Sequence, residues 1–150
     1  ALNDVNQLLL GLSSSDMFVT VFYGVLDPKS GQLTYANAGH NPPLMRRASG
    51  AIQQLTRTGV ALGLMEYATL TDARLSFASG DLLLIYTDGV TEAFNTEEEQ
   101  YGLDRLIEAV RSAPASDASQ QLAHLSSHLA SFTRDAVPFD DITFFIILRE

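Results

Sequence analysis

Apolar residues recur every three or four positions in three parts of the chain, as on the buried face of a helix. The positions are Leu2, Val5, Leu8, Leu9 and Leu12; then Leu103, Leu106, Ile107 and Val110; and finally Leu122, Leu125, Leu129 and Phe132. We expect the first helix to stop at Gly11, because glycine is a poor helix former. Ser116 or Asp117 is expected to cap the last helix, since both side chains can accept a hydrogen bond from the first turn.

Shorter apolar runs bounded by turn residues predict seven β-strands. They cover residues 17–27, 32–38, 44–47, 52–55, 73–77, 82–86 and 142–148. The first run is apolar on both alternating faces, which is typical of a strand at the centre of stacked sheets. Turns such as Asp27-Pro28-Lys29-Ser30-Gly31 join neighbouring strands as hairpins. The pattern therefore predicts an α+β fold with mainly antiparallel sheets and helices packed on them.

Length and composition restrict the classes of protein that need to be considered. The chain has 150 residues, which fits one domain, and neither an internal repeat nor a long linker divides it. It starts with Ala1-Leu2-Asn3 and a helical pattern that is already running, so we expect it to be part of a larger protein. It contains no apolar run of about 18 residues, so no membrane contact is expected.

Charge and cysteine content exclude further classes. The formal net charge of −9 makes nucleic acid an unsuitable partner, since phosphate backbones require a basic surface. The chain has no cysteine. This excludes disulfides, thiolate zinc sites and cysteine-dependent phosphatase chemistry, and it fits a reducing cytoplasm.

Acidic residues stand at the edges of two apolar runs. Asp88 follows the run 82–87 and precedes Gly89, while Asp140 and Asp141 directly precede the last apolar run. A strand end fixes a side chain well, and carboxylates suit hard cations such as Mg²⁺ or Mn²⁺. Gly89 would let backbone or water approach closely. Asp-Gly is also a common turn pair, so spacing alone leaves a metal site and an ordinary turn both open.

Five segments resemble the SpoIIE/RsbU branch of the type 2C, or PPM, phosphatases. TDGVTEA at 87–93 and DDIT at 140–143 are similar to two segments of that branch, and YANAGHNPP at 35–43 is similar to a third. MFVT at 17–20 and ALGL at 61–64 match in order and spacing. Five motifs in the family's order cover essentially the whole chain, which makes the resemblance highly specific.

The resemblance implies a fold and a reaction. The fold is a β-sandwich of two stacked antiparallel sheets flanked by helices, and residues 1–150 would be the C-terminal portion of one catalytic domain that lacks its first strands. The reaction is hydrolysis of phosphoserine or phosphothreonine on a protein. In the intact domain two Mn²⁺ or Mg²⁺ ions hold a bridging water that attacks phosphorus, with no covalent intermediate on the protein.

The same resemblance implies roles for individual residues. Asp88 and Asp140 would be metal ligands, with Asp141 as the alternative ligand if the register shifts by one. Gly89 would hold the tight backbone beside Asp88. His40 would either act near the phosphate or stabilise its own loop through a hydrogen bond.

Thr87 and Thr91 would support the metal ligands through hydrogen bonds.

The chain departs from the family at two upstream segments. The GGDxYD-like segment, which supplies a bridging aspartate, does not occur, and neither does the Asp-x-x-Gly-His-Gly segment. Gly39-His40 does not replace the latter, because Asn41 stands where its last glycine belongs. We therefore expect the parent protein to be an active phosphatase, and this chain by itself to bind metal weakly and hydrolyse little.

Partners are implied by the resemblance alone. The usual substrate in this branch is a phosphorylated anti-anti-sigma factor of the STAS fold, and a sensor or receiver domain commonly precedes the phosphatase domain in the same cytoplasmic protein. Dimerisation is common. Two other hypotheses stay open: a catalytically inactive module that binds a partner in sigma-factor signalling, and a different metallohydrolase acting on a small phosphate ester.

Two pairs of basic residues could bind a metal ion or a phosphoprotein, but the sequence gives little support for either role. His124 and His128 have the i, i+4 spacing that can hold a metal ion, but Ser126 and Ser127 indicate a solvent-facing side and no third ligand is evident. Arg46 and Arg47 are adjacent on a strand, so at most one of them can face a phosphoprotein at the site.

Overall fold

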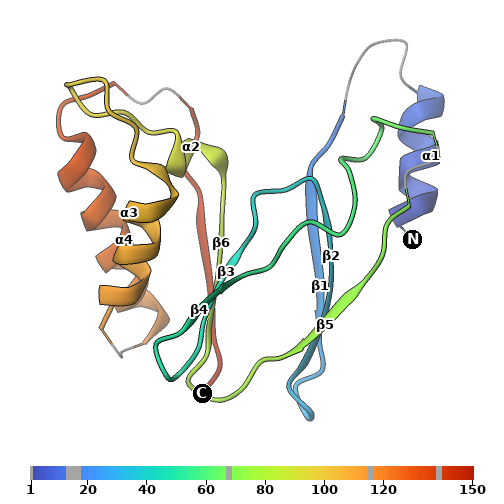
Figure 1. Ribbon diagram of the computed structural model, residues 1–150, viewed down its shortest axis with the longest axis horizontal. Coiled ribbons are helices and arrows are strands. Elements are labelled where there is room, and N and C mark those ends of the chain that lie inside the picture. The colour runs from blue at the N-terminus through green and yellow to red at the C-terminus, as the bar shows by residue number, and fades with distance from the viewer. Residues whose placement is uncertain (1, 13–17, 67–68, 115–116, 138–139) are drawn as a thin grey trace. The chain divides into compact units, whose positions relative to one another are not determined.

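The computed structural model describes residues 2–12, 18–66, 69–114, 117–137 and 140–150 (Figure 1). The chain divides into two compact units. The first comprises Ala1–Pro42 and Leu55–Phe77, and the second comprises Pro43–Gln54 and Ala78–Glu150. Met17, in the first predicted strand, and Ser116, one of the two cap candidates, lie outside the described residues.

The first unit combines one helix with a three-stranded antiparallel sheet. The helix is α1 (Leu2–Leu12), and the strands are β1 (Val21–Leu26), β2 (Gln32–Ala38) and β5 (Ala73–Ser76), in the order β1-β2-β5. The predicted hairpin between β1 and β2 is confirmed, with Leu26 opposite Leu33. Asp27 stabilises its turn because its carboxylate accepts hydrogen bonds from the Lys29 amide and the Ser30 hydroxyl.

The prediction that β1 is buried on both faces is wrong. Among the described strands β1 pairs with β2 alone, and the side chains of Tyr23 and Val25 are 53% and 54% exposed. The apolar and aromatic composition of this run reflects its preference for extended backbone. Burial depends in addition on what covers the strand, which the run itself does not encode.

Helix α1 continues past the position at which we expected it to stop. Gly11 lies inside the helix, and a β-carbon at this position would meet no other atom within 4 Å. Glycine lowers helix propensity without ending a helix by itself. The buried Asn6 holds α1 in place: its side chain accepts a hydrogen bond from the Gly63 amide and donates one to the Met65 carbonyl.

The second unit contains a four-stranded antiparallel sheet and three helices. The strands are β3 (Leu44–Arg46), β4 (Ile52–Gln54), β6 (Leu82–Tyr86) and β7 (Phe144–Leu148), in the order β4-β3-β6-β7. The helices are α2 (Asp88–Thr91), α3 (Gly102–Ser112) and α4 (Ala118–Thr133), of which α3 and α4 lie side by side (Figure 1). The α+β class with antiparallel sheets is therefore confirmed.

The core of the second unit lies between its sheet and its helices. Leu84 on β6, Leu106 on α3 and Leu125 on α4 belong to one buried cluster. Asp117 caps α4 as predicted, since its carboxylate accepts a hydrogen bond from the Gln120 amide at 2.8 Å. The buried cluster fixes β6 and β7 firmly, and the candidate site lies at one end of these two strands.

Among the described residues, we find no helix with both the length and the apolar character needed to cross a membrane.

Candidate active site

The carboxyl end of β6 carries the first candidate ligand. Leu82, Leu83 and Leu84 are almost completely buried, so the strand is anchored along its length. The chain then passes through Thr87 into the single turn α2, whose first residue is the exposed Asp88. A rigid strand thus presents a carboxylate to solvent at its end.

The second acidic segment lies directly against the first. The Thr87 hydroxyl donates a hydrogen bond to the Asp141 carbonyl at 2.9 Å and accepts one from the Thr143 amide at 3.0 Å. The Thr87 amide also donates to the Thr143 carbonyl at 3.2 Å, which extends the β6–β7 pairing by one residue. These bonds bring Asp88 and Asp140, 52 positions apart in the sequence, to the same end of two adjacent strands.

Gly89 permits this close approach. A β-carbon at position 89 would lie 2.4 Å from the Asp141 carbonyl oxygen and 3.4 Å from the Asp140 carbonyl carbon. Real β-carbons do not approach another atom to 2.4 Å, so any larger side chain would push the two segments apart. The role expected for Gly89, a tight backbone beside Asp88, agrees with this packing.

The two carboxylates are positioned by short local hydrogen bonds. Asp88 Oδ1 accepts from the Gly89 amide at 3.1 Å, and Asp140 Oδ1 accepts from the Asp141 amide at 2.7 Å. Both residues are exposed, and in the described part of the chain the second carboxylate oxygen of each makes no hydrogen bond. Each side chain therefore offers one carboxylate oxygen to a cation.

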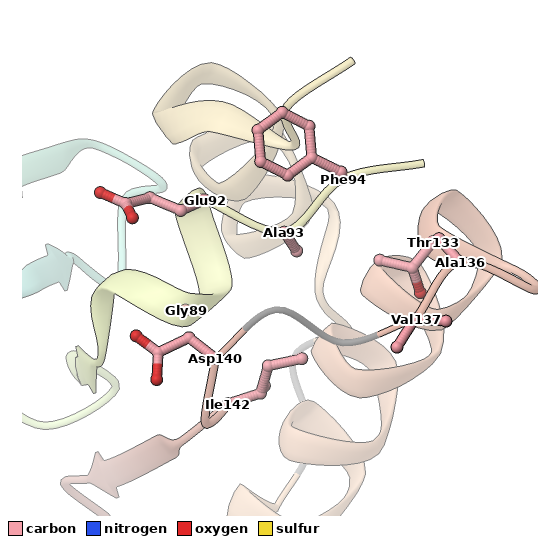
Figure 2. Close-up of a pocket in the computed structure, with 9 residues that line it drawn as sticks. All are labelled: Gly89, Glu92, Ala93, Phe94, Thr133, Ala136, Val137, Asp140 and Ile142. Atoms are coloured by element: carbon pink, nitrogen blue, oxygen red, sulfur yellow. The ribbon is translucent and has the colours of Figure 1, made fainter. Parts of the chain in front are cut away.

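A small pocket adjoins this end of the sheet. It has a volume of about 30 Å³ and is lined by Gly89 and Asp140 together with apolar side chains that include Phe94, Val137 and Ile142. Figure 2 shows the carboxylates of Glu92 and Asp140 extending toward the same side, with Gly89 between them. Glu92 was not among the predicted site residues, although its spacing of four residues from Asp88 places it one helical turn away.

The donor set fits part of a metal site. Carboxylate oxygens are the ligands that Mg²⁺ and Mn²⁺ prefer, so Asp88 and Asp140 have suitable chemistry. Among the residues that the structure describes, however, no group of three His, Cys, Asp or Glu side chains could hold a metal ion. The backbone carbonyl of Asp141 accepts the hydrogen bond from Thr87, and its exposed carboxylate stays the alternative metal ligand.

His40 belongs to the first unit, where its ring interacts with its own loop. Its Nδ1 lies 2.8 Å from the Asn41 carbonyl oxygen, and its backbone carbonyl accepts a hydrogen bond from Arg57 Nε at 3.5 Å. Gly39 adopts a positive φ of 75° against the backbone of Ala61. These contacts support the loop-stabilising role. A role near the phosphate stays a prediction.

Ser126 and Ser127 are exposed as expected, whereas His124 and His128 are half-buried. His128 Nδ1 lies 2.7 Å from the Tyr101 hydroxyl, and His124 Nε2 lies 3.3 Å from the Ser112 hydroxyl. Burial raises the pKa of Tyr101 to about 12, so this phenol stays protonated at neutral pH. The pair joins α4 to α3 and the residue that precedes it, which is a structural role.

Sequence comparison connects the chain with bacterial phosphatases. The family model for Stage II sporulation protein E (SpoIIE) matches residues 1–150. The chain is 37% identical over 133 residues to Protein IcfG of Synechocystis, an alignment covering 89% of the chain and 21% of that protein. It is 27% identical over 153 residues to the phosphoserine phosphatase RsbU of Bacillus subtilis, covering 99% of the chain and 44% of RsbU. The chain thus spans less than half the length of either relative.

Solved structures show the same fold. The SiaA-PP2C domain of Pseudomonas aeruginosa matches 99% of the chain, and 59% of that domain's chain, with a TM-score of 0.85 at 18% identity. The phosphatase domain of SpoIIE from Bacillus subtilis matches 99% of the chain, and 64% of its own, with a TM-score of 0.74 at 15% identity. At identities of 15% and 18% these structures show a shared fold alone, whereas the match to the family model rests on the sequence. Together they show that the chain belongs to the SpoIIE family of type 2C phosphatase domains.

Proposed function

We propose that the parent protein is a metal-dependent phosphatase that hydrolyses phosphoserine or phosphothreonine on a regulatory protein. One observation carries the proposal: the ends of β6 and β7 bring Asp88 and Asp140 together around Gly89, which has no side chain to separate them. Membership of the SpoIIE family and the resemblance to RsbU, a phosphoserine phosphatase, support it.

Asp88 and Asp140 would hold Mn²⁺ or Mg²⁺, two ions in the intact domain. When bound, the ions would supply the Lewis acidity that lowers the pKa of a water molecule and offsets the negative charge of the phosphoryl oxygens. The protein's own residues position the metal ligands. Thr87 fixes the backbone of Asp141, and the Asp141 amide in turn orients the Asp140 carboxylate. The chain has no cysteine, so no phosphocysteine intermediate can form on its residues.

Two carboxylates are too few to hold two hard cations, which prefer six or more oxygen ligands each. We therefore propose that the chain as printed is weakly active or inactive, and that further ligands come from the rest of the parent protein. The substrate we propose is a phosphorylated anti-anti-sigma factor of the STAS fold, with control by a sensor or receiver domain and a cytoplasmic location. The similarity to RsbU, a phosphoserine phosphatase, supports the phosphoserine part of this assignment.

A second function is favoured by the small number of ligands. Among the described residues no group of three candidate ligands comes together, which also suits a module that binds a partner protein without turnover. The two functions differ in one property, since the enzyme requires the carboxylates at 88 and 140 and the binding module does not.

The test uses single variants of the parent protein. We expect Asp88→Asn and Asp140→Asn to lower kcat on a phosphoprotein on the order of 100-fold or more, because a neutral amide is a poor ligand for a hard cation. Asp104→Asn, an exposed change in the first turn of α3, is the matched control and should leave kcat unchanged.

Three outcomes separate the hypotheses. Retention of full activity by either ligand variant would contradict the proposed site. Lack of turnover by the unmodified parent protein, with partner binding intact, would favour the inactive module. Faster turnover of a small phosphate ester than of any phosphoprotein would favour a different metallohydrolase.

A further inference from the structure

Basic side chains gather in one place on the second unit, far from the carboxylates. The chain has nine lysines and arginines against 18 acidic residues. Four of the nine, Arg46, Arg47, Arg111 and Arg149, line one pocket. Of the described residues that line it, Glu150 is the only acidic one. The pocket therefore differs in charge from the chain as a whole, whose net charge is −9.

Arg46 forms the inner wall of this pocket. It is 8% exposed, and its guanidinium donates hydrogen bonds to the carbonyls of Val110 and Ala113 at 2.8 and 2.9 Å and to the side-chain oxygen of Gln121. All three acceptors are neutral. Burial lowers the pKa of Arg46, but an arginine stays charged at any ordinary pH. Its positive charge therefore lies in the wall of the pocket, and none of these three hydrogen-bond partners is a carboxylate. A charge in this position would attract an anion.

Two other arginines are held in place by ion pairs. Arg47 lies 2.8 Å from the buried carboxylate of Asp81, and Arg111 lies 2.6 Å from Glu108. The pair with the buried Asp81 limits the conformations of the Arg47 side chain, so less entropy is lost when this guanidinium binds a ligand. The side chains of Arg47 and Arg111 are 28% and 56% exposed, which leaves them accessible from the pocket.

The pocket is a separate site from the carboxylate end of the sheet. It lies where β6 begins and β7 ends, since the Gly80 amide donates to the Arg149 carbonyl at 2.7 Å. Asp88 follows the other end of β6, roughly 20 Å away at about 3.3 Å per strand residue. The volume of the pocket is about 420 Å³, within the range usual for small-molecule sites.

We propose that this pocket binds a small phosphate-bearing anion. Planar guanidinium groups match the oxygens of a phosphate with paired hydrogen bonds, and several of them around a concave site select for this chemistry. The size of the pocket leaves room for more than one phosphate group. The ligand is free inorganic phosphate or a condensed phosphate such as the one a nucleotide carries, and these share the same recognising groups.

The test is calorimetric titration of the chain with inorganic phosphate and with pyrophosphate, in low salt and without divalent cations. The absence of metal makes the result independent of the proposed phosphatase function. We expect saturable binding of pyrophosphate and at least a tenfold loss of affinity in the double variant Arg111→Gln/Arg149→Gln. The double variant Arg57→Gln/Arg74→Gln changes the net charge equally but lies in the first unit, and it should bind within twofold of the unmodified chain.

Arg111→Lys provides a second variant that keeps the charge and the fold. It should lose affinity by a smaller factor, because lysine lacks the planar fork. Saturable binding of pyrophosphate but not of inorganic phosphate would identify a condensed phosphate as the ligand. Binding of both probes would show that one phosphate group suffices for recognition. Absence of binding of either probe at millimolar concentration would overturn the proposal. An equal loss in both double variants would overturn it too, because the attraction would then be unspecific.

Discussion

Gly89 is the residue on which the geometry of the candidate site depends most. A β-carbon at this position would overlap the Asp141 carbonyl oxygen, and the hydroxyl of Thr87 donates a hydrogen bond to that same oxygen. No catalytic chemistry is required of Gly89. Its contribution is the absence of a side chain, which lets two acidic segments from distant parts of the sequence lie in contact.

We predict that Gly89→Ala destabilises the fold and disturbs the site. The added methyl group would lie 2.4 Å from the Asp141 carbonyl oxygen, so the closing segment must move away. Overpacking of this kind costs about 1–3 kcal/mol in the free energy of unfolding, which urea denaturation measures.

Gly11→Ala is the matched control for this change. A β-carbon at Gly11 would meet no atom within 4 Å, and the residue lies inside α1. Alanine in a helix is more favourable than glycine by about 0.5–1 kcal/mol. Equal effects of the two substitutions would show that Gly89 acts through helix propensity and not through contact with Asp141.

The sequence identified the two acidic segments of the site but not its pocket. Asp88 and Asp140 could be found because each borders an apolar run, and a strand end is a fixed position. Phe94 and Val137 could not, since they reach the pocket through loops whose path depends on tertiary packing. Glu92 could have been found from its spacing of four residues from Asp88.

At the scale of the elements, Asp81 anchors the start of β6. Its carboxylate accepts hydrogen bonds from the amides of Ala78 and Ala48 at 2.9 and 3.0 Å and pairs with Arg47 at 2.8 Å. Burial alone would raise the pKa of Asp81. The hydrogen bonds and the Arg47 charge outweigh burial, so the pKa lies below its ordinary value of 3.8.

This lowered pKa predicts a pH dependence of stability. A carboxylate whose pKa is lower in the folded state contributes stability above its unfolded pKa, and that contribution is lost as the pH falls through the folded value. We expect Asp81→Asn to cost about 1.5–3 kcal/mol near pH 7. The difference between the two proteins should shrink as the pH falls below about 4.

Chemical denaturation at a series of pH values checks this prediction. Asp104→Asn, exposed on α3, should show no comparable loss at pH 7. A difference between Asp81→Asn and the unmodified chain that stayed constant down to pH 2 would contradict the account, because protonation of Asp81 would then carry no cost.

Most elements could be predicted, and the failures have physical causes. Strands 32–38 and 82–86 were predicted to the residue because sharp turn signals bound their apolar runs. Helix α2 was missed because four residues are too short for a helical period to show. The burial of β1 was misjudged because composition does not tell whether a further strand lies beside it, and among the described strands β1 pairs with β2 alone.

At the scale of the whole molecule, two antiparallel sheets with their helices give the fold of the type 2C phosphatases. The second unit carries both candidate sites, the carboxylates at one end of β6 and the arginine pocket at the other. The prediction that residues 1–150 form part of one catalytic domain stays a prediction. Opposite charge at the two strand ends is the feature of this unit that the linear sequence did not reveal.

The central claim is that Asp88 and Asp140 share a cation, and paramagnetic line broadening by Mn²⁺ in amide NMR spectra tests it most directly. The method detects weak binding, which is what two carboxylates allow. We predict that substoichiometric Mn²⁺ broadens the amides of residues 88–92 and 140–143 most strongly, leaves those near Arg149 sharp, and loses this effect in Asp88→Asn/Asp140→Asn. Broadening centred elsewhere, or unchanged in the double variant, would contradict the account.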